Sequence, residues 1–413
     1  MKHILAFLLC TGSLLTGLAQ PKNVIRGRVL HSQTGAGVPG ASVFITNTSI
    51  GTVSDNSGAF ELPGVPEGSY ELVVSSVGFQ TKVYTYKAAQ LPLQLDVRLK
   101  PKIEELQTVV VEPGEKNGWE KWKFFFTRNF LGSNEAGRGC EIKNYKTLRF
   151  RYSKTKGTLH VLADDPLIIE NKVLGYRVKY QLEDFRFNFQ THTLIFYGYS
   201  LFSELNKNGP SPRQLKNREK AYNGSVAHFM YSLYHDSLQK EGFEVRRLVR
   251  KPNLEKERVQ AMCAAALKKQ RAEHPGYLEV PAMNAIGDKD SGSYYAAVLR
   301  QQNIIEEYGK PLLTADSLLL DRDSLSRKLF FRDYLYIIYK KGKEDQDYLD
   351  YNQENRNLSF PRSNAFLPGG VPITIEPTGN YYEPQDFLTM GYWAWNEKVG
   401  ILLPLDYKKR VGR

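Results

Sequence analysis

The chain has 413 residues, of which 41% are hydrophobic and 24% charged, which is typical of a folded protein of two or three domains. Its formal net charge is +12, yet residues 21–112 hold eight basic and eight acidic side chains, so the excess lies further along the chain. A basic surface favours anionic lipid, polysaccharide or peptidoglycan, although scattered lysines on a solvated surface explain the charge equally well. No nucleic-acid recognition motif is present, so we expect no nucleic-acid partner.

Residues 1–19 have the pattern of a signal peptide. Lys2 and His3 precede an apolar run from Ile4 to Leu15, and small residues stand before a cut after Ala19. The run is too short to span a membrane as a helix. The alternative is a buried N-terminal strand, but the pattern favours an exported protein.

Residues 20–100 show the rhythm of a β-sandwich, with short apolar runs separated by Gly, Pro, Asn, Asp and Ser. Leu93, Leu95 and Val97 alternate with polar residues, so one face of that strand is apolar. Turn residues such as Gly40 and Gly58 supply positive φ angles. The predicted strands lie near 24–30, 41–47, 58–62, 69–77, 80–86 and 93–99.

An ordered series of short motifs lies on these strands and turns. The motifs are Gly27-x-Val29, Val38-Pro39-Gly40-Ala41-x-Val43, Gly51-Thr52-x-Ser54-Asp55-x-x-Gly58-x-Phe60 and Val74-Ser75-x-x-Gly78-Phe79. The series resembles the carboxypeptidase regulatory-like domain, a prealbumin-like β-sandwich that is an accessory module in bacterial envelope proteins. The resemblance implies a seven-stranded sandwich and a periplasmic or outer-membrane-associated protein. It implies no peptidase activity, because the catalytic zinc domain of that family is a separate unit.

Residues 101–118 are interpreted as a linker. The segment IEELQTVVVEP resembles the stretch that joins this sandwich to the plug of TonB-dependent transporters, but no plug-like sequence follows. We interpret it as a last strand and a tether. The fold class is therefore mainly β with α+β, in which the sandwich precedes an uncharacterised α+β domain over residues 119–413.

The α+β domain begins with an amphipathic helix and continues with a sheet. Trp119, Trp122, Phe126 and Phe130 fall at helical spacing, so the helix packs on a sheet or, alternatively, lies on a membrane surface. Alternating strands follow over residues 146–202, with a phase slip at Glu183-Asp184 that predicts a bulge. Such strands also occur in small outer-membrane barrels, which remains an alternative.

Helices are predicted over residues 226–238 and 254–271, where apolar residues recur at helical spacing. Residues 288–293 are interpreted as a turn, because the oxygen donors there lack the closing glutamate of a calcium loop. Residues 328–340 read as one strand, and residues 340–357 as a charged loop or solvated hairpin.

The aromatic C-terminal region supplies the candidate binding residues Tyr392, Trp393 and Trp395. Trp393 and Trp395 are two residues apart, so in a strand they share a face and could stack on sugar rings. The alternative is that these rings pack in the core, where tryptophan usually lies.

The sequence contains none of the common catalytic motifs of hydrolases. None of the seven histidines has a glutamate three residues later, so the zinc motif of metallocarboxypeptidases is absent from the sequence. The sequence also lacks HExxH, GxSxG and a phosphate-binding glycine loop. His228 and His235 share a side of the predicted helix, but the sequence shows no third residue that would complete a metal site with them. We therefore expect no metal and no cofactor. Cys140 and Cys263 could pair in an exported protein or remain free thiols.

These observations favour an exported cell-envelope protein that binds or docks a partner without catalysis. The partner is another envelope protein or a glycan, and association with a membrane stays open. The alternatives are a cell-wall or glycan hydrolase with no recognisable motif and a small outer-membrane barrel component.

Overall fold

The computed structural model describes residues 23–66, 68–102, 114–273, 289–321, 326–382 and 384–408. Contacts divide the chain into two compact units, Met1–Ile45 with Ile50–Glu104 and Thr46–Ser49 with Glu105–Arg413. The predicted signal peptide over residues 1–19 and most of the predicted linker lie outside the described residues, including the strand expected in IEELQTVVVEP.

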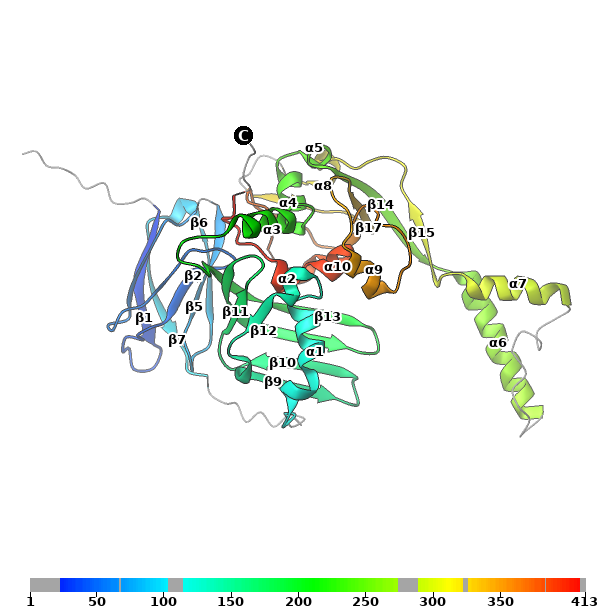
Figure 1. Ribbon diagram of the computed structural model, residues 1–413, viewed down its shortest axis with the longest axis horizontal. Helices are drawn as coiled ribbons and strands as arrows, with labels where there is room; N and C mark the ends of the chain where they lie inside the picture. Colours follow the sequence, from blue (N-terminus) through cyan, green and yellow to red (C-terminus); the bar gives the residue numbers. More distant parts are fainter. Residues whose placement is uncertain are drawn as a thin grey trace, which may run out of the picture. The chain divides into compact units, whose positions relative to one another are not determined.

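The first unit is a sandwich of seven strands (Figure 1). One sheet has the order β4-β1-β7 and the other β3-β2-β5-β6, with β1 and β7 parallel. The strands are β1 (Val24–His31), β2 (Ser42–Ile45), β3 (Gly51–Val53), β4 (Ala59–Pro63), β5 (Ser69–Ser75), β6 (Lys82–Lys87) and β7 (Leu93–Leu99). Val29, Val43, Leu72 and Val97 are fully buried and form the apolar interior. The six predicted strands are confirmed. β3 is an additional strand, and its three residues are too few to show an alternating pattern in the sequence.

The second unit opens with the predicted amphipathic helix, α1 (Gly118–Phe130), which packs on a six-stranded sheet. Phe126 and Phe130 are fully buried, and their rings lie 5.0 Å from Phe185 and 5.2 Å from Tyr180. The sheet has the order β8-β11-β12-β10-β9, and β13 pairs with β12. Its strands are β8 (Cys140–Ile142), β9 (Leu148–Ser153), β10 (Thr158–Ala163), β11 (Leu167–Asn171), β12 (Tyr176–Asn188) and β13 (Thr193–Glu204). The packed helix and the bulge between Leu182 and Asp184 are both confirmed.

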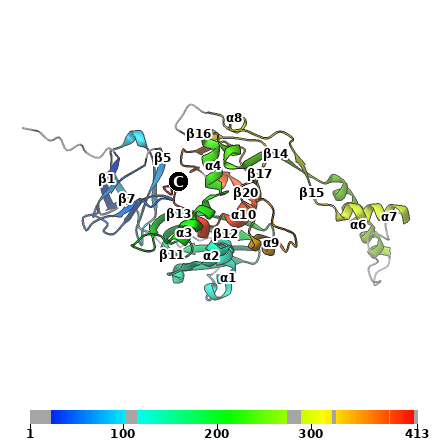
Figure 2. The same ribbon diagram turned by 45° about the horizontal axis from the view of Figure 1, so that its top comes forward.

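A second sheet in this unit has five strands in the order β15-β14-β17-β18-β20, all antiparallel. These are β14 (Phe243–Pro252), β15 (Ile304–Tyr308), β17 (Tyr334–Tyr339), β18 (Arg362–Phe366) and β20 (Leu388–Gly391), and β16 (Arg327–Leu329) and β19 (Ile373–Ile375) form a separate pair. One face of the five-stranded sheet carries Phe243, Val245, Leu335 and Ile337 into a large apolar core. Figure 2 shows β14, β15, β17 and β20 in the turned view.

The remaining helices cover or extend these sheets. They are α2 (Glu135–Arg138), α3 (Pro212–Tyr222), α4 (Val226–Tyr234), α5 (Leu238–Glu241), α6 (Leu254–Glu273), α7 (Lys289–Arg300), α8 (Ala315–Leu318), α9 (Gln346–Asn352) and α10 (Tyr392–Asn396). Buried residues of α4, α5, α8 and α10 join the core of the five-stranded sheet. Helices α6 and α7 share a small cluster of Val259, Cys263 and Val298 at the end of the β14–β15 ribbon (Figure 1).

Several local predictions in this unit are wrong. The helix expected over 226–238 is broken into α4 and α5, because Asp236 adopts a positive φ between them. Residues 289–293 belong to α7 and not to a turn, and the expected strand 328–340 is interrupted before β17 by Asp333, whose φ is also positive. The expected loop 340–357 contains α9, whose Leu349 is fully buried and anchors it. The helix over 254–271 is confirmed as α6.

Among the helices that the structure describes, none has both the length and the apolar composition that crossing a membrane requires.

Candidate binding site

Tyr392, Trp393 and Trp395 lie in the short helix α10 and not in a strand. Trp393 donates its indole N–H to the carbonyl of Gly224 at 2.7 Å, and Trp395 donates to the Ser133 hydroxyl at 2.9 Å. The Tyr392 hydroxyl donates to Asp345 at 3.1 Å. The two tryptophans therefore do not share the face of a strand, because partners far away in the sequence fix each ring in a helical geometry.

These three side chains are also buried, with exposed fractions of 8% for Tyr392, 2% for Trp393 and 6% for Trp395. Stacking on a sugar needs an exposed ring face. The rings fill the interior instead, which was the alternative interpretation of the sequence. These three residues therefore offer no ring face for a sugar.

The two histidines of the α4 region do not form a site together. His228 is buried, its Nδ1 accepts from the N–H of Gly224 at 3.1 Å, and its Nε2 lies 3.3 Å from Glu241. His235 contacts the Pro377 carbonyl at 3.0 Å instead. Across the described parts of the chain, no group of three or more His, Cys, Asp and Glu side chains is placed to hold a metal ion. Cys140 and Cys263 are both free thiols.

A polar cluster lies at the bulge of β12, on the face of the six-stranded sheet away from α1. Asp184 accepts from Arg186 at 2.6 Å and lies 3.1 Å from His160 Nε2. Burial lowers the pKa of His160 below its ordinary value of 6.5, and Arg186 and Arg151 act in the same direction against the opposing effect of Asp184. Both carboxylate oxygens of Asp184 therefore have partners within the cluster, so Asp184 does not offer a free acceptor to a ligand.

The other face of the five-stranded sheet has a different character from its core face. Its side chains alternate with the buried ones, and cross-strand pairing places Tyr308, Leu248, Tyr334, Phe366 and Leu388 in one row across all five strands. The Tyr334 and Phe366 rings are 5.0 Å apart. Except for Leu248, which is buried, these side chains are partly or largely exposed. We call this row, together with Tyr336, the aromatic row.

Hydrogen bonds and ring contacts fix one end of the aromatic row. Glu306 accepts from the Tyr308 hydroxyl at 2.6 Å and lies 3.1 Å from Arg250 Nε. The Tyr308 ring packs edge-on at 4.7 Å from Tyr336. Partial burial and the bond to Glu306 raise the pKa of Tyr308 above its ordinary value of 10.0, so its hydroxyl stays protonated at neutral pH. The network holds Tyr308, which is 48% exposed, in a defined orientation.

The sheet curves toward the aromatic row. Arg250 lies over the Tyr334 ring at 5.4 Å and approaches Met390 Sδ at 3.4 Å. Strands β14 and β20, which carry Arg250 and Met390, are separated by β17 and β18. Cross-strand pairing places Met390 level with Arg246, four residues before Arg250. In a flat sheet the two residues would therefore be about 14 Å apart across the strands and about 13 Å apart along them, which is beyond the reach of their side chains, so the sheet bends between them. We therefore call this surface the concave face.

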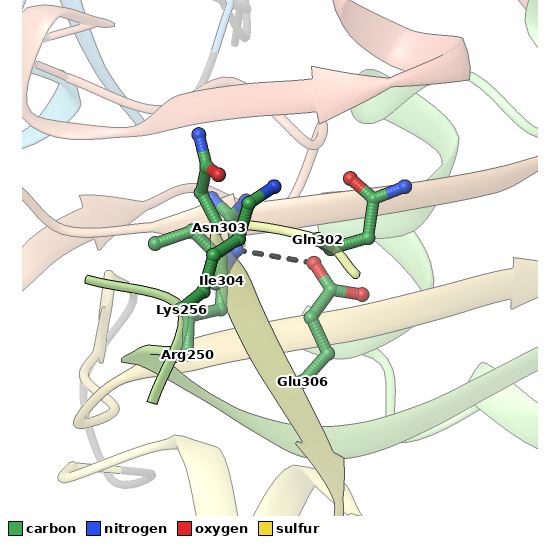
Figure 3. Close-up of a pocket in the computed structure, with 6 residues that line it drawn as sticks. All are labelled: Arg250, Lys256, Gln302, Asn303, Ile304 and Glu306. Carbon is green, nitrogen blue, oxygen red and sulfur yellow. Dashed lines mark ion pairs between the residues drawn. The ribbon is translucent and has the colours of Figure 1, made fainter. Parts of the chain in front are cut away.

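A cleft of about 540 Å³ opens at the edge of the concave face. It is lined by Arg250, Lys256, Gln302, Asn303, Ile304 and Glu306 (Figure 3). Asn253 helps to shape its wall, because its side chain donates to the Gln302 carbonyl at 3.1 Å and begins α6 by accepting from Lys256 N–H. The cleft has the size of a small-ligand site and brings several amide and charged groups together.

The sequence contains a signal for part of this surface. In the predicted strand over 328–340, Tyr334 and Tyr336 alternate with Leu335 and Ile337, which places tyrosines on one face. The signal does not show which strands lie alongside, and no strand is predicted from the sequence over residues 304–308, where β15 lies. The cleft was therefore missed, because it depends on strand pairing between distant segments.

Comparison with known proteins identifies the first unit. Residues 25–111 match the CarboxypepD_reg-like domain. The N-terminal quarter of the chain is a carboxypeptidase regulatory-like domain. The match supports the sandwich interpretation for these residues. No curated protein matches the chain.

Solved structures give only distant likenesses, each with a TM-score of 0.16. A type II cohesin–X-dockerin complex from Acetivibrio cellulolyticus is 17% identical, and the match covers 18% of this chain and 51% of that chain, about half its length. A proposed carbohydrate-binding protein from Bacteroides uniformis is 14% identical, with 46% and 81% covered. A proposed membrane-associated protein of unknown function from Bacteroides fragilis is 10% identical, with 90% and 95% covered. At this TM-score they carry no argument about the present chain.

Proposed function

We propose that this protein is an exported cell-envelope protein that binds glycan chains on the concave face of its five-stranded sheet. The observation that carries the proposal is that the exposed ring of Tyr308 and the partly exposed rings of Tyr334 and Tyr336 adjoin a cleft lined mainly by amide and charged side chains. In this proposal the carboxypeptidase regulatory-like domain is an accessory module that docks or spaces the binding unit in the envelope.

The chemistry of the concave face suits a sugar. Sugar rings have apolar C–H faces that pack on tyrosine rings, and Tyr308, Tyr334 and Tyr336 offer such rings close together. Sugar hydroxyls both donate and accept hydrogen bonds. Gln302 and Asn303 have amide groups that do the same, while Arg250 and Lys256 donate only.

Glycan binding is tested by affinity electrophoresis of the purified protein in gels that contain single polysaccharides. We expect retardation by at least one glycan, and Tyr336→Ala should weaken it about three- to tenfold, since aromatic contacts contribute about 0.5–1.5 kcal/mol. The matched control is Tyr197→Ala, which removes a tyrosine that is 44% exposed on β13. Equal losses in the two variants, or no retardation by any glycan, would contradict the proposal.

Two further outcomes separate this proposal from others. Release of shortened sugars from the retained glycan would identify a hydrolase and would overturn a purely binding role. Cell fractionation with and without detergent tests export, and recovery of the protein in the cytoplasmic fraction would contradict the envelope part of the proposal.

A further inference from the structure

The charges on the concave face and in its cleft are not balanced. The carboxylate of Glu306 is matched by Arg250, and Glu244 lies 3.8 Å from Lys340. Three other basic side chains, Arg246, Arg362 and Lys256, form no ion pair with a carboxylate within the part of the chain that the structure describes. The charge of Arg362 also acts on the buried Glu344 carboxylate, which is already paired with Arg356 at 2.6 Å. The surface therefore has an excess of positive charge beside its aromatic row.

Arg246 and Arg362 lie on the same face of the sheet as the tyrosines, and Lys256 lies in the adjoining cleft. Arg246 pairs across the strands with Tyr336 and donates to the carbonyls of Gly309 and Lys310, which orients its guanidinium. Arg362 is exposed on β18 opposite Ile338, on the same face of the strand as Phe366. Lys256 lines the cleft and donates to the Gln301 carbonyl.

Such an arrangement is costly without a ligand, because like charges on one concave surface repel each other. A bound anion relieves this repulsion. Guanidinium groups also present paired N–H donors that match the two oxygens of a carboxylate or sulfate. Sugar-ring contact with the tyrosines and anion contact with the arginines can therefore be made by one polymer.

We propose that the ligand of the concave face is an acidic glycan, whose sugar rings pack on the aromatic row while its carboxylate or sulfate groups pair with Arg246, Arg362 and Lys256. This inference rests on the glycan-binding function proposed above and names the class of glycan. Neutral polysaccharides should bind more weakly, and binding should fall as salt screens the exposed charges.

The test compares polygalacturonate with the same polymer after chemical reduction of its carboxyl groups, using affinity electrophoresis with the full chain. We expect at least tenfold weaker retention by the reduced polymer, because hydrogen bonds to charged groups are stronger than neutral ones. A sulfated galactan forms a second arm and shows whether sulfate replaces carboxylate. Polyglutamate forms a third arm and reports charge without sugar.

Each outcome decides one point. Equal retention by the native and reduced polymers would overturn the acidic-glycan inference and leave glycan binding intact. Binding to polyglutamate as tight as to either acidic glycan would also overturn it, because charge alone would then explain the affinity. Failure of every polysaccharide, neutral panel included, would remove the proposed function itself.

Variants locate the charge effect. Arg362→Gln should weaken acidic-glycan binding about tenfold and reduce its salt dependence. The control is Lys251→Gln, whose side chain lies on the opposite face of the β14–β15 ribbon and pairs with Glu307 at 2.8 Å. If both variants lose the same affinity, the concave face is not where the anionic groups bind.

Discussion

Replacing Arg218 with methionine removes a buried guanidinium that joins α3 to the six-stranded sheet. Arg218 is 4% exposed and its guanidinium lies 3.7 Å from the centre of the Tyr176 ring. It donates to the Leu174 carbonyl at 2.7 Å and forms two bonds with the Glu204 carboxylate at 2.9 and 2.7 Å. Methionine keeps the packing on Tyr176 but makes none of these hydrogen bonds.

The loss in the free energy of unfolding depends on the interactions that Glu204 and the Leu174 carbonyl lose. Breaking a buried ion pair costs about 3–5 kcal/mol. Glu204 is 41% exposed, so water replaces part of its interaction with Arg218, and the lower end of that range applies. The Leu174 carbonyl loses a charged donor in a buried setting, which contributes about 1.5–3 kcal/mol of the total. We therefore expect the free energy of unfolding of the second unit to fall by about 3 kcal/mol.

Tryptophan fluorescence during urea unfolding measures this change selectively. All four tryptophans, Trp119, Trp122, Trp393 and Trp395, lie in the second unit, so the sandwich does not contribute to the signal. The matched control is Arg213→Met on the same helix, because Arg213 is 82% exposed and its contact with Glu135 at 3.4 Å should contribute less than about 1 kcal/mol. Equal losses for the two variants would refute the reasoning.

Three further predictions concern other parts of the chain. Burial alone would raise the pKa of Glu344, but hydrogen bonds from Arg356 and the Ser359 N–H hold this pKa below its ordinary value of 4.5. The ionised carboxylate therefore contributes its full stabilisation above pH 4.5, and that stabilisation is lost as the pH falls through the lowered pKa. Glu344→Gln should therefore destabilise the second unit at neutral pH and flatten its acid unfolding curve, and an unchanged curve would contradict this. Gly27→Ala should destabilise the sandwich by about 3 kcal/mol or more, since a Cβ there would lie 1.8 Å from the Leu95 carbonyl oxygen. Faster proteolysis of residues 23–102 should reveal this loss of stability. In the control Gly64→Ala the new Cβ meets nothing within 4 Å, so only the positive φ of 72° opposes it and the cost should be about 1 kcal/mol. Burial raises the pKa of the Cys140 thiol to about 12, so alkylation at neutral pH should be slow until the chain unfolds. Both Cys140 and Cys263 should then react without a reductant, and a requirement for reductant would contradict the free thiols.

The sandwich could be predicted from sequence because its signals are local. Each strand carries its own alternation, and turn glycines stand between strands. Gly27 illustrates the link between motif and fold, since the close approach of β1 to β7 leaves no room for a side chain there. The helix α1 was equally clear, because Trp119, Phe126 and Phe130 repeat at helical spacing over more than two turns.

The candidate site could not be predicted because it depends on distant partners. Tyr392, Trp393 and Trp395 match a strand pattern, yet hydrogen bonds to Asp345, Gly224 and Ser133 fix them as a buried helix. Tyr334 and Tyr336 were visible as an alternating pair, but nothing local indicates that β15 lies two strands away from them. The cleft brings together Arg250 and Asn303, which are separated by the helices α6 and α7.

Hydrogen exchange with and without the bound glycan tests the central claim most directly. The account predicts that an acidic polysaccharide retained by the protein slows amide exchange in β14, β15 and β17, over residues 243–252, 304–308 and 334–339. It predicts little change in α10, over residues 392–396, because those rings are already buried. Protection confined to α10, to the six-stranded sheet or to the sandwich would place the ligand elsewhere and would contradict binding on the concave face.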